Sequence, residues 1–190
     1  MSSTVLYMSM SLDGFISGRD VSPEQGLGEG GERLHDWLFD GEVVGANLLV
    51  RDEFMATGAI LAGKGTFEPA DGWGGDHHDG VPIHILSRHP KPEWAANWPE
   101  VHYSNDVGSA ARAAKVAAGD KNVLVHGAST AQRLIAAGLL DELEIHLIPV
   151  LLGEGVRLFE HLGAAQRELE RVRVLEGDAG VTHLHYRVVR

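Results

Sequence analysis

Short apolar runs separated by polar turns predict strands along the first two thirds of the chain. The run Thr4–Ser11, rich in Val, Leu, Tyr and Met, predicts a first strand that ends at the turn pair Asp13-Gly14. Further runs predict strands at 59–62, 82–86, 101–103 and 123–125. The last of these is continuously apolar, which is typical of a strand covered on both faces.

Helical spacing of apolar residues appears between these strands. In segment 32–39, Leu34, Trp37 and Leu38 fall on one helical face. Other helices are predicted at 51–56, from the N-cap Asp106 through Ala118 with Gly119 as the stop, and after Val125 as far as Gly138. Glycine-rich composition marks 18–31 and 69–80 as loops.

The last third of the chain changes to strict alternation. Segments 143–150 and 182–189 alternate apolar with charged or histidine positions, and Val172 and Val174 alternate with arginines. Such a pattern without intervening helices predicts antiparallel strands with one solvated face. We therefore expect one α/β domain over residues 1–190, with a mixed, mostly parallel central sheet of about eight strands, flanking helices and an antiparallel C-terminal end.

Composition narrows the class of protein. The 27 acidic and 16 basic residues give a formal charge of −11, which argues against a nucleic-acid partner. There is no cysteine, so the cytoplasm is the expected compartment. No window approaches the roughly 20 apolar residues of a membrane span, and we expect no membrane partner.

Three strand ends carry groups suited to an anionic ligand. The segment VLVHGASTA (123–131) is a strand that runs into Gly127 and small hydroxyl residues at a helix start, where free backbone N–H groups attract anions. AGKGTFE (62–68) adds Lys64 and a hydroxyl, and LSRHP (86–90) adds Arg88. Ligands of open α/β sheets sit at the carboxyl ends of strands, so the three segments together suit NADPH.

A serine hydrolase is the alternative interpretation of the same corner. Gly127-Ala128-Ser129-Thr130-Ala131 departs from the G-x-S-x-G nucleophile elbow only at its last position. Asp141 or Glu144, followed by His183 or His185, would complete the order of a catalytic triad. This alternative leaves GKGTFE and LSRHP unexplained.

The segments in this order resemble a known family. MSLDGFISG, GKGTFE, LSRHP, HGAST and above all AAGLLDELEIHLIPVLLGEGVRLF (136–159) are similar to the dihydrofolate-reductase-like group that includes the reductase domain of the bifunctional riboflavin-biosynthesis deaminase/reductase. The likeness is to its stand-alone members, because the cysteines of the deaminase zinc signature are absent.

The resemblance implies a dihydrofolate-reductase-like fold and an NADPH-dependent oxidoreductase. The substrate would be a small pterin- or pyrimidinone-like heterocycle that accepts a hydride at C=N or C=O. The cofactor residues that it implies are Ile16, Gly63, Lys64, Gly65, Thr66, Ser87, Arg88, His126, Gly127, Ala128, Ser129 and Thr130. Two of these depart from the family, which usually has arginine at the position of Lys64 and a second glycine at the position of His126.

Candidates for proton transfer are Asp13, in the family motif SLDG, and Asp36 on the adjacent helix; His35 and Asp52 are further candidates. The resemblance and the alternating C-terminal end also favour a homodimer. A nucleotide-binding module without turnover remains a further alternative, because no proton donor stands out.

The histidines do not predict a metal site. His77 and His78 point in different directions in an extended chain, and no third ligand follows at metal spacing. We expect these two in a solvated loop, and His183 and His185 on a solvated sheet face.

Overall fold

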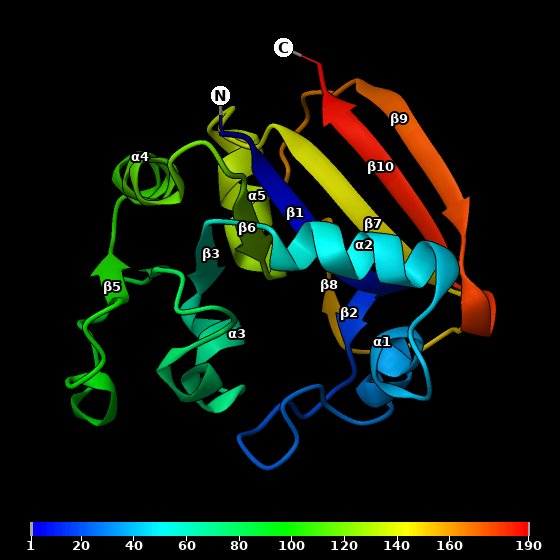
Figure 1. Cartoon of the computed structure of the whole chain (residues 1–190), viewed down its shortest axis with the longest axis horizontal. Coiled ribbons are helices and arrows are strands. Elements are labelled where there is room, and N and C mark those ends of the chain that lie inside the picture. The colour runs from blue at the N-terminus through cyan, green and yellow to red at the C-terminus, as the bar shows by residue number, and fades with distance from the viewer. Residues whose placement is uncertain (1, 190) are drawn as a thin grey trace.

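The centre of the fold follows from strands that are apolar on both faces. The computed structural model describes residues 2–189 (Figure 1). Strand β1 (Thr4–Ser11) has buried side chains on both faces, so it needs neighbours at both edges and covering layers on both sides. It lies between β6 (Val123–His126) and β7 (Glu142–Ile148), parallel to both.

Eight strands form the main sheet in the order β5-β4-β3-β6-β1-β7-β10-β9. The remaining strands of this sheet are β3 (Ala59–Gly63), β4 (Ile83–Leu86), β5 (Val101–Ser104), β9 (Leu169–Glu176) and β10 (Thr182–Val188). All neighbours from β5 to β7 are parallel, whereas β10 is antiparallel to β7 and β9. The short strands β2 (Phe15–Ser17) and β8 (Val156–Arg157) pair separately. The predicted fold class is confirmed.

Helices cover both faces of the sheet (Figure 1). On one face, α4 (Val107–Ala118) and α5 (Ala128–Ala136) bury their alanine and leucine side chains against β3, β6 and β1. On the other face lie α1 (Asp36–Phe39), α2 (Gly45–Met55) and α3 (Lys64–Phe67). No described helix has both the length and the apolar character that a membrane crossing requires.

Two predicted helices, α4 and α5, are found, and two others differ from their predicted extent. Asp106 caps α4 as predicted, its carboxylate accepting a hydrogen bond from the backbone N–H of Ser109 at 2.7 Å. The helix predicted at 51–56 begins instead at Gly45, after Val44, which offers no capping side chain. The helix predicted at 32–39 is a 3₁₀ segment followed by α1, with a break at His35.

The solvated face predicted for segments 143–150 and 182–189 is wrong. Glu144 and His183 are fully buried and His146 is 5% exposed. Helices α1 and α2 cover this face, as α2 in front of the sheet in Figure 1 shows. The Glu144 carboxylate lies 3.4 Å from the Arg173 guanidinium and 3.0 Å from His185 Nδ1, although burial still raises its pKa.

Candidate functional site

A cavity of about 700 Å³ opens where the carboxyl ends of β1, β3 and β6 meet, and it continues beneath α1 and α2. Strand order places β6 between β3 and β1, which makes this the point where the chain reverses its direction of strand addition. Ligands of open α/β sheets bind at such a point. The cavity is therefore the candidate functional site.

Two strand-to-helix corners form one side of the cavity. We call residues 63–66 and 127–130 the glycine rim. A Cβ atom built on Gly127 would lie 2.1 Å from Thr66 Oγ1, and one built on Gly63 would lie 2.9 Å from Thr130 Oγ1. Gly127 also has φ +88°, a conformation that favours glycine. In each corner, the space that a side chain on the glycine would need is therefore occupied by the threonine of the other corner.

Most of the predicted cofactor residues lie at this cavity. Those that line it are Ile16, Gly63, Gly65, Thr66, His126, Ala128, Ser129 and Thr130. Gly127 connects two of them. Lys64 is not a lining residue, and its ammonium group lies 3.4 Å from the Glu68 carboxylate. Ser87 and Arg88 follow the end of β4, whose Leu86 is in register with Gly63, so they lie on the same sheet edge outside the cavity.

Of the candidates for proton transfer, Asp13, Asp36 and Asp52 lie outside the cavity lining. Asp13 Oδ1 accepts a hydrogen bond from Ser11 Oγ, and its other carboxylate oxygen accepts one from the Gly153 N–H at 2.7 Å. These bonds hold the pKa of Asp13 below its usual value, the Ser11 hydroxyl contributing most. Asp36 lies 3.3 Å from Arg33. The catalytic roles of Asp13 and Asp36 remain predictions, whereas His35 does line the cavity.

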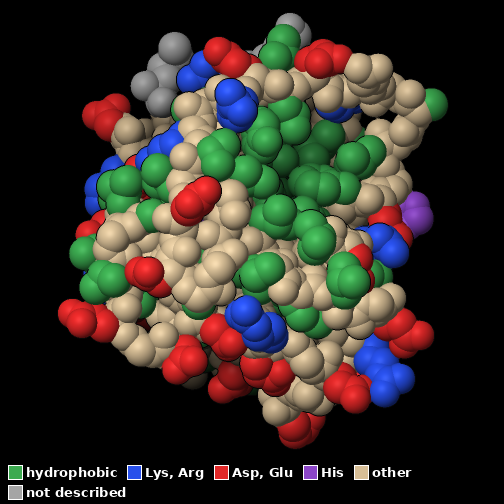
Figure 2. Space-filling model, turned by 90° about the vertical axis from the view of Figure 1, so that its right-hand side faces the viewer, with side chains coloured by type: hydrophobic (Ala, Val, Ile, Leu, Met, Phe, Trp, Pro, Cys, Tyr) green, Lys and Arg blue, Asp and Glu red, His purple; other side chains and the backbone are tan. Residues whose placement is uncertain are grey.

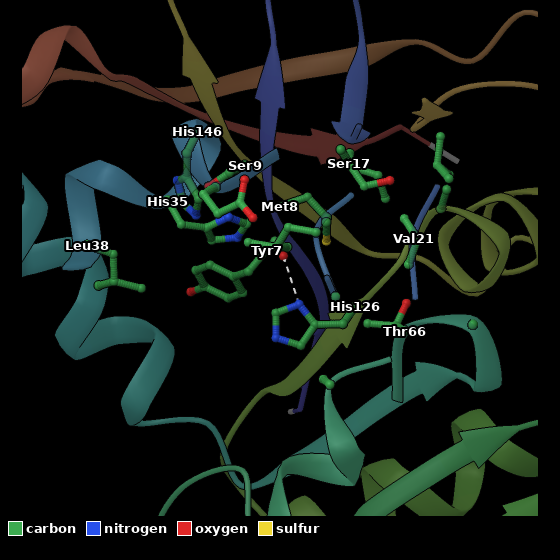
Figure 3. Close-up of a pocket in the computed structure, with 18 of the residues that line it drawn as sticks. Tyr7, Met8, Ser9, Ser17, Val21, His35, Leu38, Thr66, His126 and His146 are labelled. Atoms are coloured by element: carbon green, nitrogen blue, oxygen red, sulfur yellow. Dashed lines mark hydrogen bonds between the residues drawn. The ribbon is translucent and has the colours of Figure 1, made fainter. Parts of the chain in front are cut away.

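The opposite side of the cavity, which we call the aromatic end, was only partly anticipated. Its rings come from five separate segments of the sequence. They belong to Tyr7, to His35 and Trp37, to Phe54, to Trp73 and His77, and to His146. Figure 3 shows Tyr7, His35, His126 and His146 arranged around one space. His126 lies between the glycine rim and the aromatic end, 5.2 Å from the His77 ring.

Trp37 and Trp73 both line the cavity, but in different ways. Trp37 is buried and its indole N–H donates to Ser9 Oγ at 2.9 Å. Trp73 has φ +51° between two glycines that are also left-handed, a strained backbone for a large residue. This conformation places its ring 4.6 Å from the His77 ring.

The predicted surroundings of the histidines are wrong. His78 is buried and His77 lines the cavity, so they do not form a solvated loop. His183 packs with its ring 4.9 Å from Trp37. The sequence feature that indicates burial is the pairing of histidine and charged positions on adjacent strands. His183, for example, lies opposite His146 in the register of β10 and β7. Such facing positions can satisfy one another under a covering layer.

Burial keeps these imidazoles neutral. Desolvation lowers the pKa of His77 to about 2 and the pKa values of His126 and His183 to about 4. It lowers the pKa of His146 and His35 as well. Among the described residues, no three His, Asp or Glu side chains are placed to share a metal ion.

The structure does not support the hydrolase alternative. Ser129 starts α5, but within residues 2–189 no hydrogen bond joins its hydroxyl to a histidine. His183 is engaged instead with His146 and Asn47. A serine without a base is not an activated nucleophile.

Taken together, the fold and the site define an α/β protein with a cavity at the carboxyl edge of a mostly parallel sheet. The chain belongs to the RibD C-terminal domain family, whose model matches residues 3–183. This assignment confirms the resemblance found in the sequence. Among curated proteins, none matches the chain.

Solved structures with the same fold include both stand-alone and longer proteins. A candidate riboflavin biosynthesis protein of Shewanella sp. PV-4 is 20% identical, with a TM-score of 0.75 and 99% of each chain covered. A pyrimidine reductase-like protein of Corynebacterium diphtheriae is 15% identical, with a TM-score of 0.67 over 100% of this chain and 92% of the other. A Thermotoga maritima diaminohydroxyphosphoribosylaminopyrimidine deaminase/5-amino-6-(5-phosphoribosylamino)uracil reductase is 12% identical, with a TM-score of 0.66; 99% of this chain covers 57% of it.

The close approach of the two corners predicts how substitution of Gly127 changes the free energy of unfolding. Gly127→Ala should destabilise the protein by about 3 kcal/mol, because the left-handed backbone costs about 1–2 kcal/mol and the new methyl group also meets Thr66. Gly138→Ala is the matched control, since Gly138 has φ +67° but no atom within 4 Å of a built Cβ. Urea unfolding should show a smaller loss for the control, and Thr66→Ala should recover part of the Gly127→Ala loss. Equal losses in the two single variants would contradict the close approach.

The lowered pKa of His126 makes a pH prediction. In the unfolded chain a histidine titrates near 6.5, so the unfolded state gains a proton between pH 6.5 and about 4 while folded His126 does not. Stability contributed by neutral His126 is therefore present above pH 6.5 and is lost as the pH falls. His126→Asn should reduce the stability difference between pH 7.5 and pH 5.5 by about 1 kcal/mol. Urea unfolding at both pH values measures this, with exposed His161→Gln as the control that should leave the difference unchanged.

Proposed function

We propose that the protein is a reductase that uses NADPH to reduce a C=N or C=O bond of a small pterin- or pyrimidinone-like heterocycle. The observation that carries this proposal is one continuous cavity that joins the glycine rim to the aromatic end. Membership of the RibD C-terminal domain family supports it, and so do the reductase activities named for the C. diphtheriae and T. maritima proteins.

The glycine rim fits a phosphate-bearing cofactor. Gly65 faces open space, with no atom within 4 Å of a built Cβ, so a ligand can approach its backbone. Ser129 and Thr130 lie in the first turn of α5, where backbone N–H groups and hydroxyls are available to an anion. Lys64 and Arg88, at the adjoining strand ends, supply positive charge. NADPH, when bound, would supply the hydride.

The aromatic end would orient a planar substrate. The His77 ring lies 4.6 Å from the Trp73 ring and 5.3 Å from the Phe54 ring, and these rings offer flat surfaces for stacking. Helices α1 and α2 lie over this end. Asp13 and Asp36 stay our predicted proton donors, and the cytoplasmic location expected from the cysteine-free sequence belongs to the same proposal.

Arg88 provides the sharpest test of the cofactor. If Arg88 binds the 2′-phosphate, Arg88→Ala should weaken NADPH binding at least tenfold and leave NADH binding unchanged, because only NADPH carries that group. Fluorescence titration with both coenzymes measures this, and Arg187→Ala, an exposed arginine on β10 at the opposite sheet end, is the control. Tighter binding of NADH than NADPH by the unmodified protein would refute the NADPH assignment. NADPH binding without oxidation of NADPH by any pterin or pyrimidinone would favour the binding module.

We further propose that the protein is a homodimer, formed through the outer face of β9 and β10. Leu169, Val172 and Val174 on β9 are 44–45% exposed, next to half-buried Leu184 and Tyr186 on β10. Figure 2 shows hydrophobic side chains gathered on the side of the molecule where these strands lie. An exposed apolar sheet face at an edge strand marks an interaction surface, and self-association covers it.

A charge on this face should prevent dimerisation. Val174→Glu should convert the dimer to monomer in sedimentation velocity, because a carboxylate would be buried without a partner in the interface. Val116→Glu is the matched control, since Val116 is 82% exposed on α4, away from β9 and β10. A monomer for the unmodified protein at micromolar concentration would contradict the proposal.

A further inference from the structure

Three histidines that line the cavity are each fixed in one tautomer by a hydrogen-bond chain that ends at a backbone carbonyl. The shortest chain is that of His126, whose Nδ1 lies 3.1 Å from the Tyr7 carbonyl oxygen (dashed line in Figure 3). A carbonyl oxygen only accepts, so Nδ1 carries the proton. Neutral His126 therefore has an unprotonated Nε2.

The chain of His146 gives the same result through two further residues. Asn47 Nδ2 donates to the Trp37 carbonyl, so Asn47 Oδ1 is the atom that accepts from His183 Nε2 at 3.0 Å. With Nε2 protonated, neutral His183 accepts at Nδ1, and the donor 3.0 Å away is His146 Nδ1. His146 Nε2 is left unprotonated.

His77 is fixed in the same way. The Thr57 hydroxyl donates to the Phe54 carbonyl at 2.8 Å, so its oxygen accepts from His78 Nε2 at 3.2 Å. His78 Nδ1 then accepts from His77 Nδ1 at 2.8 Å. His77 Nε2 is the third unprotonated nitrogen. No described residue donates a hydrogen bond to any of the three Nε2 atoms, and all three side chains line the cavity.

The same cavity offers little to a negatively charged group at its aromatic end. Among the described lining residues, Arg51 is the one Lys or Arg, and its guanidinium is bonded to Asp52 at 3.0 Å. Glu24 and Glu32 also line the cavity. Three hydrogen-bond acceptors and two carboxylates therefore line the cavity, and its one lining cation is already paired.

We propose that the aromatic end binds an uncharged, planar heterocycle that donates N–H hydrogen bonds to His77, His126 and His146, and that it rejects a ligand carrying a phosphate. The inference rests on the proposed function in that this ligand is the reductase substrate. Ring stacking supplies much of the affinity, and the three acceptors select ring N–H groups.

Two pairs of probes separate the parts of this proposal. Lumazine and 1,3-dimethyllumazine share one ring system, but methylation removes the N–H donors. Uridine and uridine 5′-monophosphate differ by a phosphate. Calorimetric titration of the full-length protein should give lumazine at least tenfold tighter than its dimethyl derivative, and uridine tighter than its monophosphate.

Variants assign the effects to residues. His126→Phe keeps a flat ring and removes the acceptor, so it should weaken lumazine about tenfold and leave dimethyllumazine unchanged. His77→Phe should act in the same direction, and exposed His161→Phe should have no effect. Phe39→Arg, at a lining position with a 76% exposed side chain, should raise the affinity for uridine monophosphate about tenfold relative to uridine. Unchanged affinity for dimethyllumazine shows that each variant keeps the folded cavity.

Equal affinities for the two lumazines, tighter binding of uridine monophosphate than uridine by the unmodified protein, or no binding of any probe would overturn the proposal. NADPH binding is titrated in parallel and reports on the proposed function separately. Selective lumazine binding without NADPH binding would refute the reductase and keep the ligand class. NADPH binding without selectivity between the lumazines would refute the ligand class and leave the proposed reductase function standing.

Discussion

The site depends on a reciprocal contact between two glycines and two threonines. Thr66 occupies the place that a side chain at Gly127 would need, and Thr130 occupies the place of one at Gly63. This contact lets β3 and β6 end side by side with the starts of α3 and α5 together, at the edge of the sheet where ligands bind. Larger residues at either glycine would separate the corners. The cavity and the path from the glycine rim to the aromatic end follow from this approach.

The sequence predicts the helices and strands whose formation depends on neighbouring residues in the chain. Continuous apolar runs identify the central strands, and the Asp106 cap identifies the start of α4, because a cap or a doubly buried strand needs no information from distant segments. Alternation in 143–150 and 182–189 identifies strands but not what covers them. Whether Glu144 or His183 meets water depends on α2, whose own start carries no capping signal.

The two sides of the site differ in the same way. The glycine rim could be predicted from the sequence because each of its two corners combines a glycine, a hydroxyl side chain and a helix start in contiguous residues. The aromatic end draws single residues from five separated segments, so no local pattern contains it. The hydrogen-bond chains that fix the protons of His77 and His146 run through Thr57, His183 and Asn47, which lie elsewhere in the chain. Their proximity is a property of the fold.

Neutral imidazoles provide hydrogen-bond acceptors at the aromatic end without the cost of burying a charge. A lysine or arginine there would lose its hydration and would need a paired anion, at a penalty of several kcal/mol per ion in real proteins. An imidazole whose proton is held by a backbone carbonyl offers a strong acceptor without a charge. Lys64 and Arg88 lie outside the cavity lining, at the exposed sheet edge, where a charged side chain stays in contact with water. Desolvation therefore favours an arrangement in which charged side chains lie at the exposed sheet edge and uncharged, acceptor-bearing imidazoles lie in the interior.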